Sequence, residues 1–276
     1  MRTIYLATSV LLALLAISFP LAGLAYSVSL LSLFSFYEGL ASFLFWFSLV
    51  GLAFLFPLRY IASFFGRYIK TARGLGVFVS YMSLHLVLYG LILEGIVAYS
   101  FKTPSVVSQA YLLFESIPLY PVSTISILSG FAFNPTIELF IPPVYVLALS
   151  FYTISLSFVI GVLVLTNVMK VVEIGKACGT AFRSRSLIVM PALGVIGGAA
   201  CCLSLPVLIA LVAPTTALIS DNPAIFYVAY FVFPIATAIG LKYNMDSTIR
   251  IASKVSKIVL SKSLLDGKTL GPPREK

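Results

Sequence analysis

The sequence IPPVYVLALSFYTISLSFVIGVLVLTNV, residues 141–168, runs for 28 residues without a charged side chain, and Lys170 follows it. About 20 helical residues suffice to cross about 30 Å of hydrocarbon. This run is therefore long enough for a transmembrane helix. Continuous apolar runs, without the alternation of a membrane β-barrel, predict five more helices at residues 4–29, 39–58, 75–100, 187–213 and 223–241.

Composition agrees with an all-α integral membrane protein, a bundle of about six transmembrane helices. The chain has 276 residues, of which 60% are hydrophobic and 10% charged, and its mean hydropathy is +1.08. A soluble domain carries about a quarter charged residues because its surface must be hydrated. We therefore expect the lipid bilayer to surround most of this chain.

Basic residues orient the predicted helices. Every Lys and Arg except Lys102 lies before the first helix, in the second or fourth loop, or after the sixth helix. Because Lys and Arg stay on the cytoplasmic side, this pattern predicts a plasma-membrane protein with cytoplasmic N- and C-termini. It places Glu38, Glu115, Glu138 and Asp221 outside, and it accounts for the net charge of +9 without nucleic acid as a partner.

The first predicted helix has a second interpretation. Arg2, the apolar stretch and Gly23-Leu24-Ala25 also fit a signal peptide cleaved after Ala25, which leaves five helices in the same orientation.

Two segments outside the predicted helices differ in composition: one is apolar and the other is basic. The external segment 101–138 is apolar, and we expect it to lie in the interface, form a re-entrant hairpin or cap the bundle. A transmembrane domain at residues 1–241 precedes a basic cytoplasmic tail at 242–276. There, an amphipathic helix is expected to face anionic lipid headgroups with Arg250, Lys254 and Lys257.

Adjacent cysteines lie near the middle of the fifth predicted helix, in GVIGGAACCLSLP at residues 194–206. Cys201 and Cys202 either bind a soft metal ion with help from another helix or pack a close helix contact. The stretch resembles the first helix of mercuric-ion transporters, which implies that these thiols accept the metal. That family adds a second cysteine pair on the cytoplasmic side, where this chain has only Cys178.

His85, the single histidine, lies near the centre of the third predicted helix, with Tyr81 and Tyr89 one turn away. It is a candidate haem ligand, proton relay or hydrogen-bonding partner of a tyrosine. Residues 57–59, 73–76 and His85 resemble a fragment of the ferric-reductase-type membrane domain, which implies a haem ligand. That family uses several intramembrane histidines, and one histidine cannot give bis-histidine haem b within a single chain.

Glu94 is the remaining ionisable candidate, in the outer part of the same predicted helix. A carboxyl there is expected to carry a coupling proton, or to lie in a water-filled vestibule or near the headgroups.

These residues favour a small carrier or permease-like protein, with a soft metal or thiol-reactive solute as a candidate cargo. The alternative is a non-catalytic membrane subunit of a larger complex, including a haem-containing redox complex. A homo-oligomer and membrane-complex partners both fit the sequence, and an enzyme is the less favoured class because no set of catalytic side chains is apparent.

Overall fold

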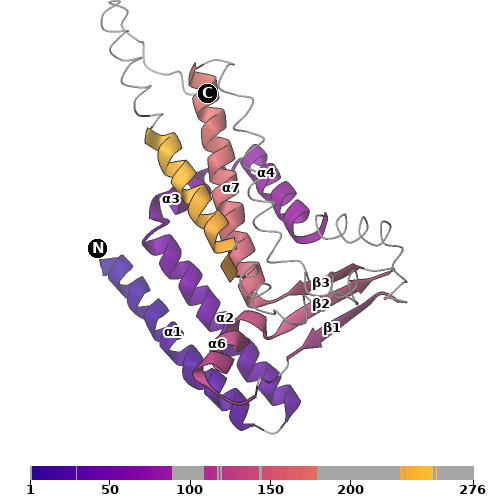
Figure 1. Cartoon of the computed structure of the whole chain (residues 1–276). Coiled ribbons are helices and arrows are strands. Elements are labelled where there is room, and N and C mark those ends of the chain that lie inside the picture. Colours follow the sequence, from indigo (N-terminus) through magenta and orange to yellow (C-terminus); the bar gives the residue numbers. More distant parts are fainter. Residues whose placement is uncertain are drawn as a thin grey trace, which may run out of the picture.

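The computed structural model describes residues 2–28, 30–88, 109–116, 118, 120–142, 145–178, 231–232, 234–250 and 253. These residues are mostly helical, as predicted (Figure 1). In chain order the elements are α1 (Arg2–Ser27), α2 (Leu31–Leu55), α3 (Arg59–Tyr68), α4 (Ala72–Ser83), the π-helical turn η1 (Leu84–Leu88), β1 (Tyr111–Glu115), α6 (Thr124–Phe133), β2 (Thr136–Ile141), β3 (Tyr145–Leu149) and α7 (Phe151–Cys178). Helical residues 234–250 follow, drawn in orange.

Three of the described helices are long and apolar enough to cross a membrane: Thr3–Ser27, Leu31–Leu55 and Phe151–Ile174. They identify the chain as a membrane protein. They correspond to the first, second and fourth predicted helices. The third predicted helix is described only as far as Leu88, the fifth lies outside the described residues, and of the sixth, residues 231–232 and 234–241 are described.

Two of these helices begin at other residues than the sequence predicted. α2 begins at Leu31 and not at residue 39, because residues 31–38 contain neither glycine nor proline and continue the helix. α7 begins at Phe151 because Ser150 and Thr153 cap its first turn. The Ser150 amide donates to Thr153 Oγ1 (2.8 Å), and the Thr153 amide donates to Ser150 Oγ (3.3 Å).

A three-stranded antiparallel sheet, which the sequence analysis did not predict, lies beside the start of α7 (Figure 1). Its order is β1-β2-β3, with Tyr111 opposite Phe140 and Leu139 opposite Leu147. The rings of Tyr111 and Phe140 stack with centroids 4.3 Å apart, the kind of cross-strand pair that stabilises a sheet. The part of residues 101–138 that the structure describes, predicted as an external segment, therefore contains β1, α6 and the beginning of β2.

The core is built around α7, which contacts α2, α3, α4 and α6. Its central residues Ile160, Val162 and Leu163 are buried, and Leu241 and Met245 of the C-terminal helical residues pack against them. Figure 1 shows α7 between α4 and the orange helix. Lipid solvates apolar side chains, so in such a core close packing contributes more than exclusion from water.

The helices also have defined directions. α1 and α2 form an antiparallel hairpin, whereas α2, α7 and helical residues 231–232 and 234–250 run the same way (Figure 1). The same-direction packing follows from four contacts: Phe43 with Phe151, Phe54 with Phe158, Phe231 with Tyr152, and Leu241 with Asn167.

Candidate functional site

Glu38 is an ionisable residue that is buried in an apolar environment. It lies in the second turn of α2 and is fully buried, where the sequence analysis had placed it in an external loop. Neither carboxyl oxygen has a hydrogen-bond partner among the described residues. One oxygen lies against Gly130 of α6 so closely that a Cβ atom at residue 130 would overlap it. Glycine at this position therefore lets α6 approach the carboxyl.

Two side chains of α2 hold α6 in this place. The Trp46 indole nitrogen donates to the Phe131 carbonyl oxygen (2.6 Å), and Ser42 Oγ donates to the Asn134 carbonyl oxygen (2.7 Å). The last carbonyls of a helix have no partner within it. Ser42 and Trp46 therefore bind carbonyls at the C-terminal end of α6, next to the contact of Gly130 with Glu38.

Aromatic packing reinforces the contact. The Phe131 side chain is fully buried, stacks on Phe45 of α2 with centroids 4.4 Å apart and meets the Phe19 ring of α1 edge-on at 5.5 Å. α6 has 10 residues, too few to span a bilayer. α6 therefore packs against α1 and α2 as a short helix within the predicted external segment.

His85 lies between α4 and α7 and is 1% exposed. Its Nδ1 is 3.4 Å from Tyr81 Oη, its Nε2 is 3.1 Å from Ser157 Oγ, and its ring stacks on that of Tyr81. Both ring nitrogens thus lie near protein oxygens. The geometry fits a histidine that joins its own helix to α7.

A buried amide joins α7 to the C-terminal helical residues. The Asn167 amide nitrogen donates to the Leu241 carbonyl (3.1 Å), and Asn244 Nδ2 donates to Asn167 Oδ1 (2.8 Å). Asn167 is fully buried, and polar bonds of this kind fix the register of packed helices.

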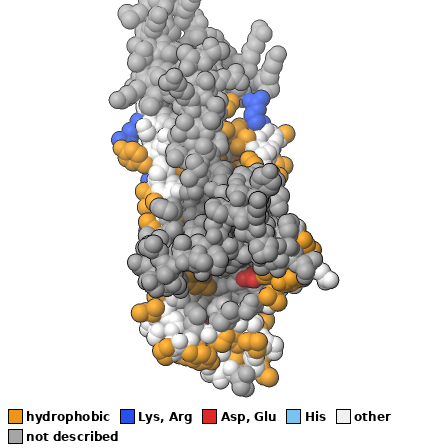
Figure 2. All heavy atoms as spheres, turned by 45° about the vertical axis from the view of Figure 1, so that its right-hand side comes forward, with side chains coloured by type: hydrophobic (Ala, Val, Ile, Leu, Met, Phe, Trp, Pro, Cys, Tyr) orange, Lys and Arg blue, Asp and Glu red, His pale blue; other side chains and the backbone are white. Residues whose placement is uncertain are grey.

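Charged groups gather at the end of the bundle where α2 and the C-terminal helical residues end. Asp246 accepts hydrogen bonds from Tyr60 Oη and from Lys242 Nζ (3.0 Å). Burial raises the pKa of Asp246, but these bonds and the nearby charges of Lys242 and Arg250 outweigh it and hold that pKa below its usual range. Burial, followed by the contact with Asp246, raises the pKa of Tyr60. On the face in Figure 2 the blue Lys and Arg side chains lie toward this end, with hydrophobic side chains beside them, and the other end shows hydrophobic side chains and uncharged white atoms.

The structure describes three of the residues that the sequence singled out. Tyr81 and His85 contact each other, and Arg250 is exposed on the C-terminal helical residues, where its charge acts on Asp246. The others lie outside the described residues: Tyr89, Glu94, Cys201, Cys202, Lys254 and Lys257. Within the described part of the chain, no three His, Cys, Asp or Glu side chains gather as a metal site would require.

Glu38 was missed as a site residue, although a sequence signal existed. It is the single charged residue in the apolar run 30–58. Reading that run as one helix from its first apolar residue would have placed a carboxyl inside the span.

No protein-family model, curated protein or solved structure matches this chain.

Proposed function

We propose that this chain is a multi-pass, carrier-like protein of the plasma membrane with cytoplasmic termini. In this proposal the Glu38 carboxyl binds either the transported cation or the proton that is coupled to transport. The observation that carries the proposal is the complete burial of Glu38 within α2, with no hydrogen-bond partner among the described residues.

A buried carboxyl without a hydrogen-bond partner does not stabilise the fold. An ionised carboxylate transferred into an apolar environment without a partner is strongly disfavoured, so it either takes up a proton or binds a cation. Both ligands can leave again, which is the chemistry that a carrier needs. Glu173 of α7 provides the contrast, because its carboxylate lies 2.8 Å from Lys170 Nζ.

The arrangement of helices supports the same proposal. α2, α7 and helical residues 231–232 and 234–250 run in one direction, and α1 runs in the other, as a bundle that crosses the bilayer repeatedly would require. α6 covers Glu38 from one end and is attached by two hydrogen bonds and one aromatic cluster. Such a short cap is a suitable element to open and close access to a binding group.

The test is transport by the full chain in proteoliposomes loaded with a pH-sensitive dye. We expect an imposed gradient of one cation from a panel of Na⁺, K⁺, Zn²⁺, Cu⁺ and tetraethylammonium to drive cation or proton flux. Glu38→Gln should abolish this flux, Glu38→Asp should retain part of it, and Glu173→Gln should behave as the matched control with flux preserved. Unchanged flux in Glu38→Gln would overturn the role of this carboxyl.

The panel includes the soft metal ion Cu⁺ because the thiols of Cys201 and Cys202 are candidate ligands for it. If Cu⁺ is the cargo, Cys201→Ser and Cys202→Ser should each reduce Cu⁺ flux, while Cys178→Ser leaves it unchanged. Equal Cu⁺ flux in all three variants would assign these thiols to helix packing.

A second candidate function, a membrane subunit of a larger complex, is favoured by β1. At the edge of the described sheet, this strand exposes apolar side chains on both of its faces: Leu112 and Phe114 on one are 67% and 58% exposed, and Tyr111 and Leu113 on the other are 49% and 40% exposed. An exposed apolar edge strand is a template for pairing with another chain. Leu112→Lys with Phe114→Lys should then release a stoichiometric partner from the complex purified from native membranes. A partner that stays bound to this variant would exclude β1 as the docking edge.

A further inference from the structure

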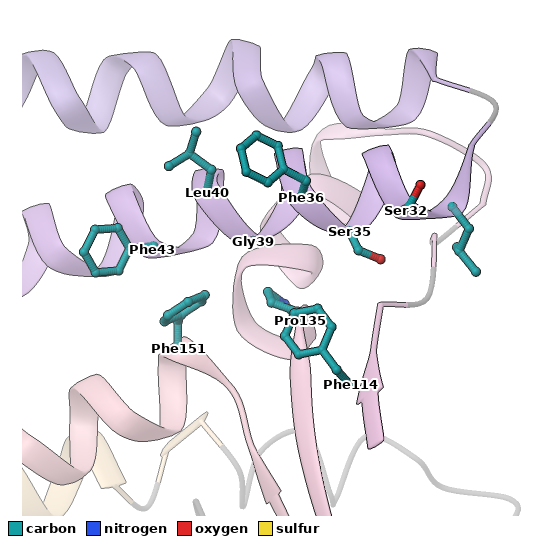
Figure 3. A pocket seen from close by; sticks show the side chains of 10 residues that line it. Ser32, Ser35, Phe36, Gly39, Leu40, Phe43, Phe114, Pro135 and Phe151 are labelled. Atoms are coloured by element: carbon teal, nitrogen blue, oxygen red, sulfur yellow. The ribbon is translucent and has the colours of Figure 1, made fainter. Parts of the chain in front are cut away.

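Two glycines bring the end of α6 into direct contact with α2. A Cβ atom at Gly130 would overlap a carboxyl oxygen of Glu38, and a Cβ atom at Gly39 would lie 3.4 Å from Pro135 Cγ. Figure 3 shows Pro135 opposite Gly39. A groove of about 750 Å³ opens beside this contact, but Glu38 does not line it. The carboxyl is therefore enclosed by protein, without space for a metal ion between it and α6.

The oxygens at the end of α6 are already engaged. Four carbonyls there accept hydrogen bonds from the protein, those of Gly130, Phe131, Phe133 and Asn134. Hard cations such as Ca²⁺ and Mg²⁺ take about six or more oxygen ligands. The side-chain oxygen beside the Glu38 carboxyl is the Tyr26 hydroxyl, which lies 3.8 Å from the same Cβ position at Gly130. Within the described part of the chain this is a poor metal site, whereas a proton needs only one carboxyl oxygen.

The electrostatics of the contact favour a neutral carboxyl. Glu38 faces the last turn of α6, and the C-terminal end of a helix carries a partial negative charge. α6 has no charged residue, and the ionisable group that faces Glu38 from α1 is the Tyr26 phenol. Arg2 lies at the other end of α1, and the first charged residue of α7, Lys170, lies about 28 Å along that helix from its start. α3 follows the far end of α2. No cation of these elements is placed to neutralise an ionised Glu38.

We propose that the ligand of Glu38 is a proton, and that α6 docks on α2 while the carboxyl holds this proton and separates from α2 when the proton leaves. The inference rests on the proposed role of Glu38 as a binding group and decides between its two candidate ligands. Loss of the proton puts an unpaired negative charge, enclosed in apolar protein, against the negative end of α6. The docked state is therefore present at low pH and is lost as pH rises. Because it holds one proton more than the separated state, the ratio of docked to separated α6 falls about tenfold per pH unit beyond the midpoint.

The experiment follows the docking of α6 in the full chain, in lipid nanodiscs without a gradient and in buffer whose cation is N-methylglucamine. The emission of Trp46, which donates to the Phe131 carbonyl, reports docking, and hydrogen exchange of the α6 amides reports it independently. As pH rises, the wild-type emission should change in one step. Exchange in α6, corrected for its intrinsic pH dependence, should become about tenfold faster per pH unit beyond the midpoint. Glu38→Gln should stay docked throughout, and Glu173→Gln should titrate as the wild type does.

Adding cations above the midpoint distinguishes the two ligands. We expect Na⁺, K⁺, Zn²⁺ and tetraethylammonium to leave α6 undocked. A cation that restores docking in the wild type but not in Glu38→Gln would overturn the proton and assign the site to that cation. Docking of the wild type that does not change with pH would overturn the coupling, and so would a wild-type titration in Glu38→Gln. Should Glu38→Gln fail to fold, Glu38→Ala should likewise stay docked at every pH.

Docking and transport are measured separately, so each proposal can fail alone. Transport that persists in Glu38→Gln, beside pH-dependent docking in the wild type, would refute the carrier role of the carboxyl and leave the proton site. Transport that is lost in Glu38→Gln, beside docking that ignores pH in the wild type, would refute the proton site and leave the carrier role.

Discussion

The contact between Gly130 and Glu38 predicts a mutation whose effect changes sign with its background. Replacing glycine by alanine inside a helix normally stabilises it by about 1 kcal/mol. At Gly130 the added Cβ would overlap Glu38 Oε1, and overpacking of this kind costs about 1–3 kcal/mol. We expect Gly130→Ala to destabilise the chain by about 1 kcal/mol net.

Removing the carboxyl should reverse the sign. In a Glu38→Ala background the space is free, and Gly130→Ala should stabilise by about 0.5–1 kcal/mol, a coupling of about 2 kcal/mol between the two residues. Glu38→Gln keeps the size of the side chain and removes its charge, so Gly130→Ala should remain destabilising there. Gly23→Ala in α1, where nothing lies within 4 Å of the new Cβ, is the matched control.

The assay uses Trp46, the single tryptophan of the chain, which donates to the carbonyl of Phe131 next to Gly130. Its emission reports whether α6 stays docked on α2 during denaturation of the purified protein in mixed micelles. A Gly130→Ala cost that is the same with and without the Glu38 carboxyl would refute the reasoning. So would stabilisation of the wild-type chain by Gly130→Ala.

Three further predictions concern contacts away from this site. Asn167→Ala removes two bonds to the C-terminal helical residues and should destabilise by about 1–3 kcal/mol, more than Asn244→Ala, in the same denaturation assay. Asp246→Asn should cost about 1 kcal/mol at pH 7 because the bond from Tyr60 is weakened. The lowered pKa of Asp246 means that its contribution is complete above the unfolded pKa of about 3.9 and is lost as pH falls through the folded value, so the variant and the wild type should converge there. Ser150→Ala removes the cap of α7 and should cost about 1 kcal/mol, seen as faster hydrogen exchange in its first turn.

The length of the apolar runs predicted a helical membrane protein, because a helix needs about 20 apolar residues to cross the hydrocarbon core of a bilayer. A span of 20 or more residues without charge has no other stable environment, and this gave α1, α2 and α7 with the correct secondary structure. The contact between Tyr81 and His85 was also accessible, because residues four apart on a helix lie on one face.

Hydropathy alone did not separate β3 from α7. Residues 141–168 carry no charge and are mostly apolar, and a short buried strand has the same hydropathy as the first turns of a buried helix. The pair Ser150 and Thr153 marks the true start of α7, and the β-branched and aromatic residues of Thr136–Ile141 mark a strand. Both signals are local and are outweighed by the 28-residue uncharged run. The boundary between β3 and α7 is therefore set by the pairing of β2 with β3, which the sequence alone does not show.

Glu38 was misplaced because a charge was taken as evidence for a loop. That inference fails where a neighbouring element covers the charge, and α6 does so here through contacts 92 residues apart in sequence, such as Ser42 with Asn134. The two kinds of buried polar group in this chain then separate on physical grounds. His85 and Asn167 bond across helices and stabilise their packing. Glu38 makes no such bond among the described residues, so its burial lowers stability unless a proton or a cation binds it. This difference is the reason for proposing that Glu38 binds a ligand at the contact of α2 with α6.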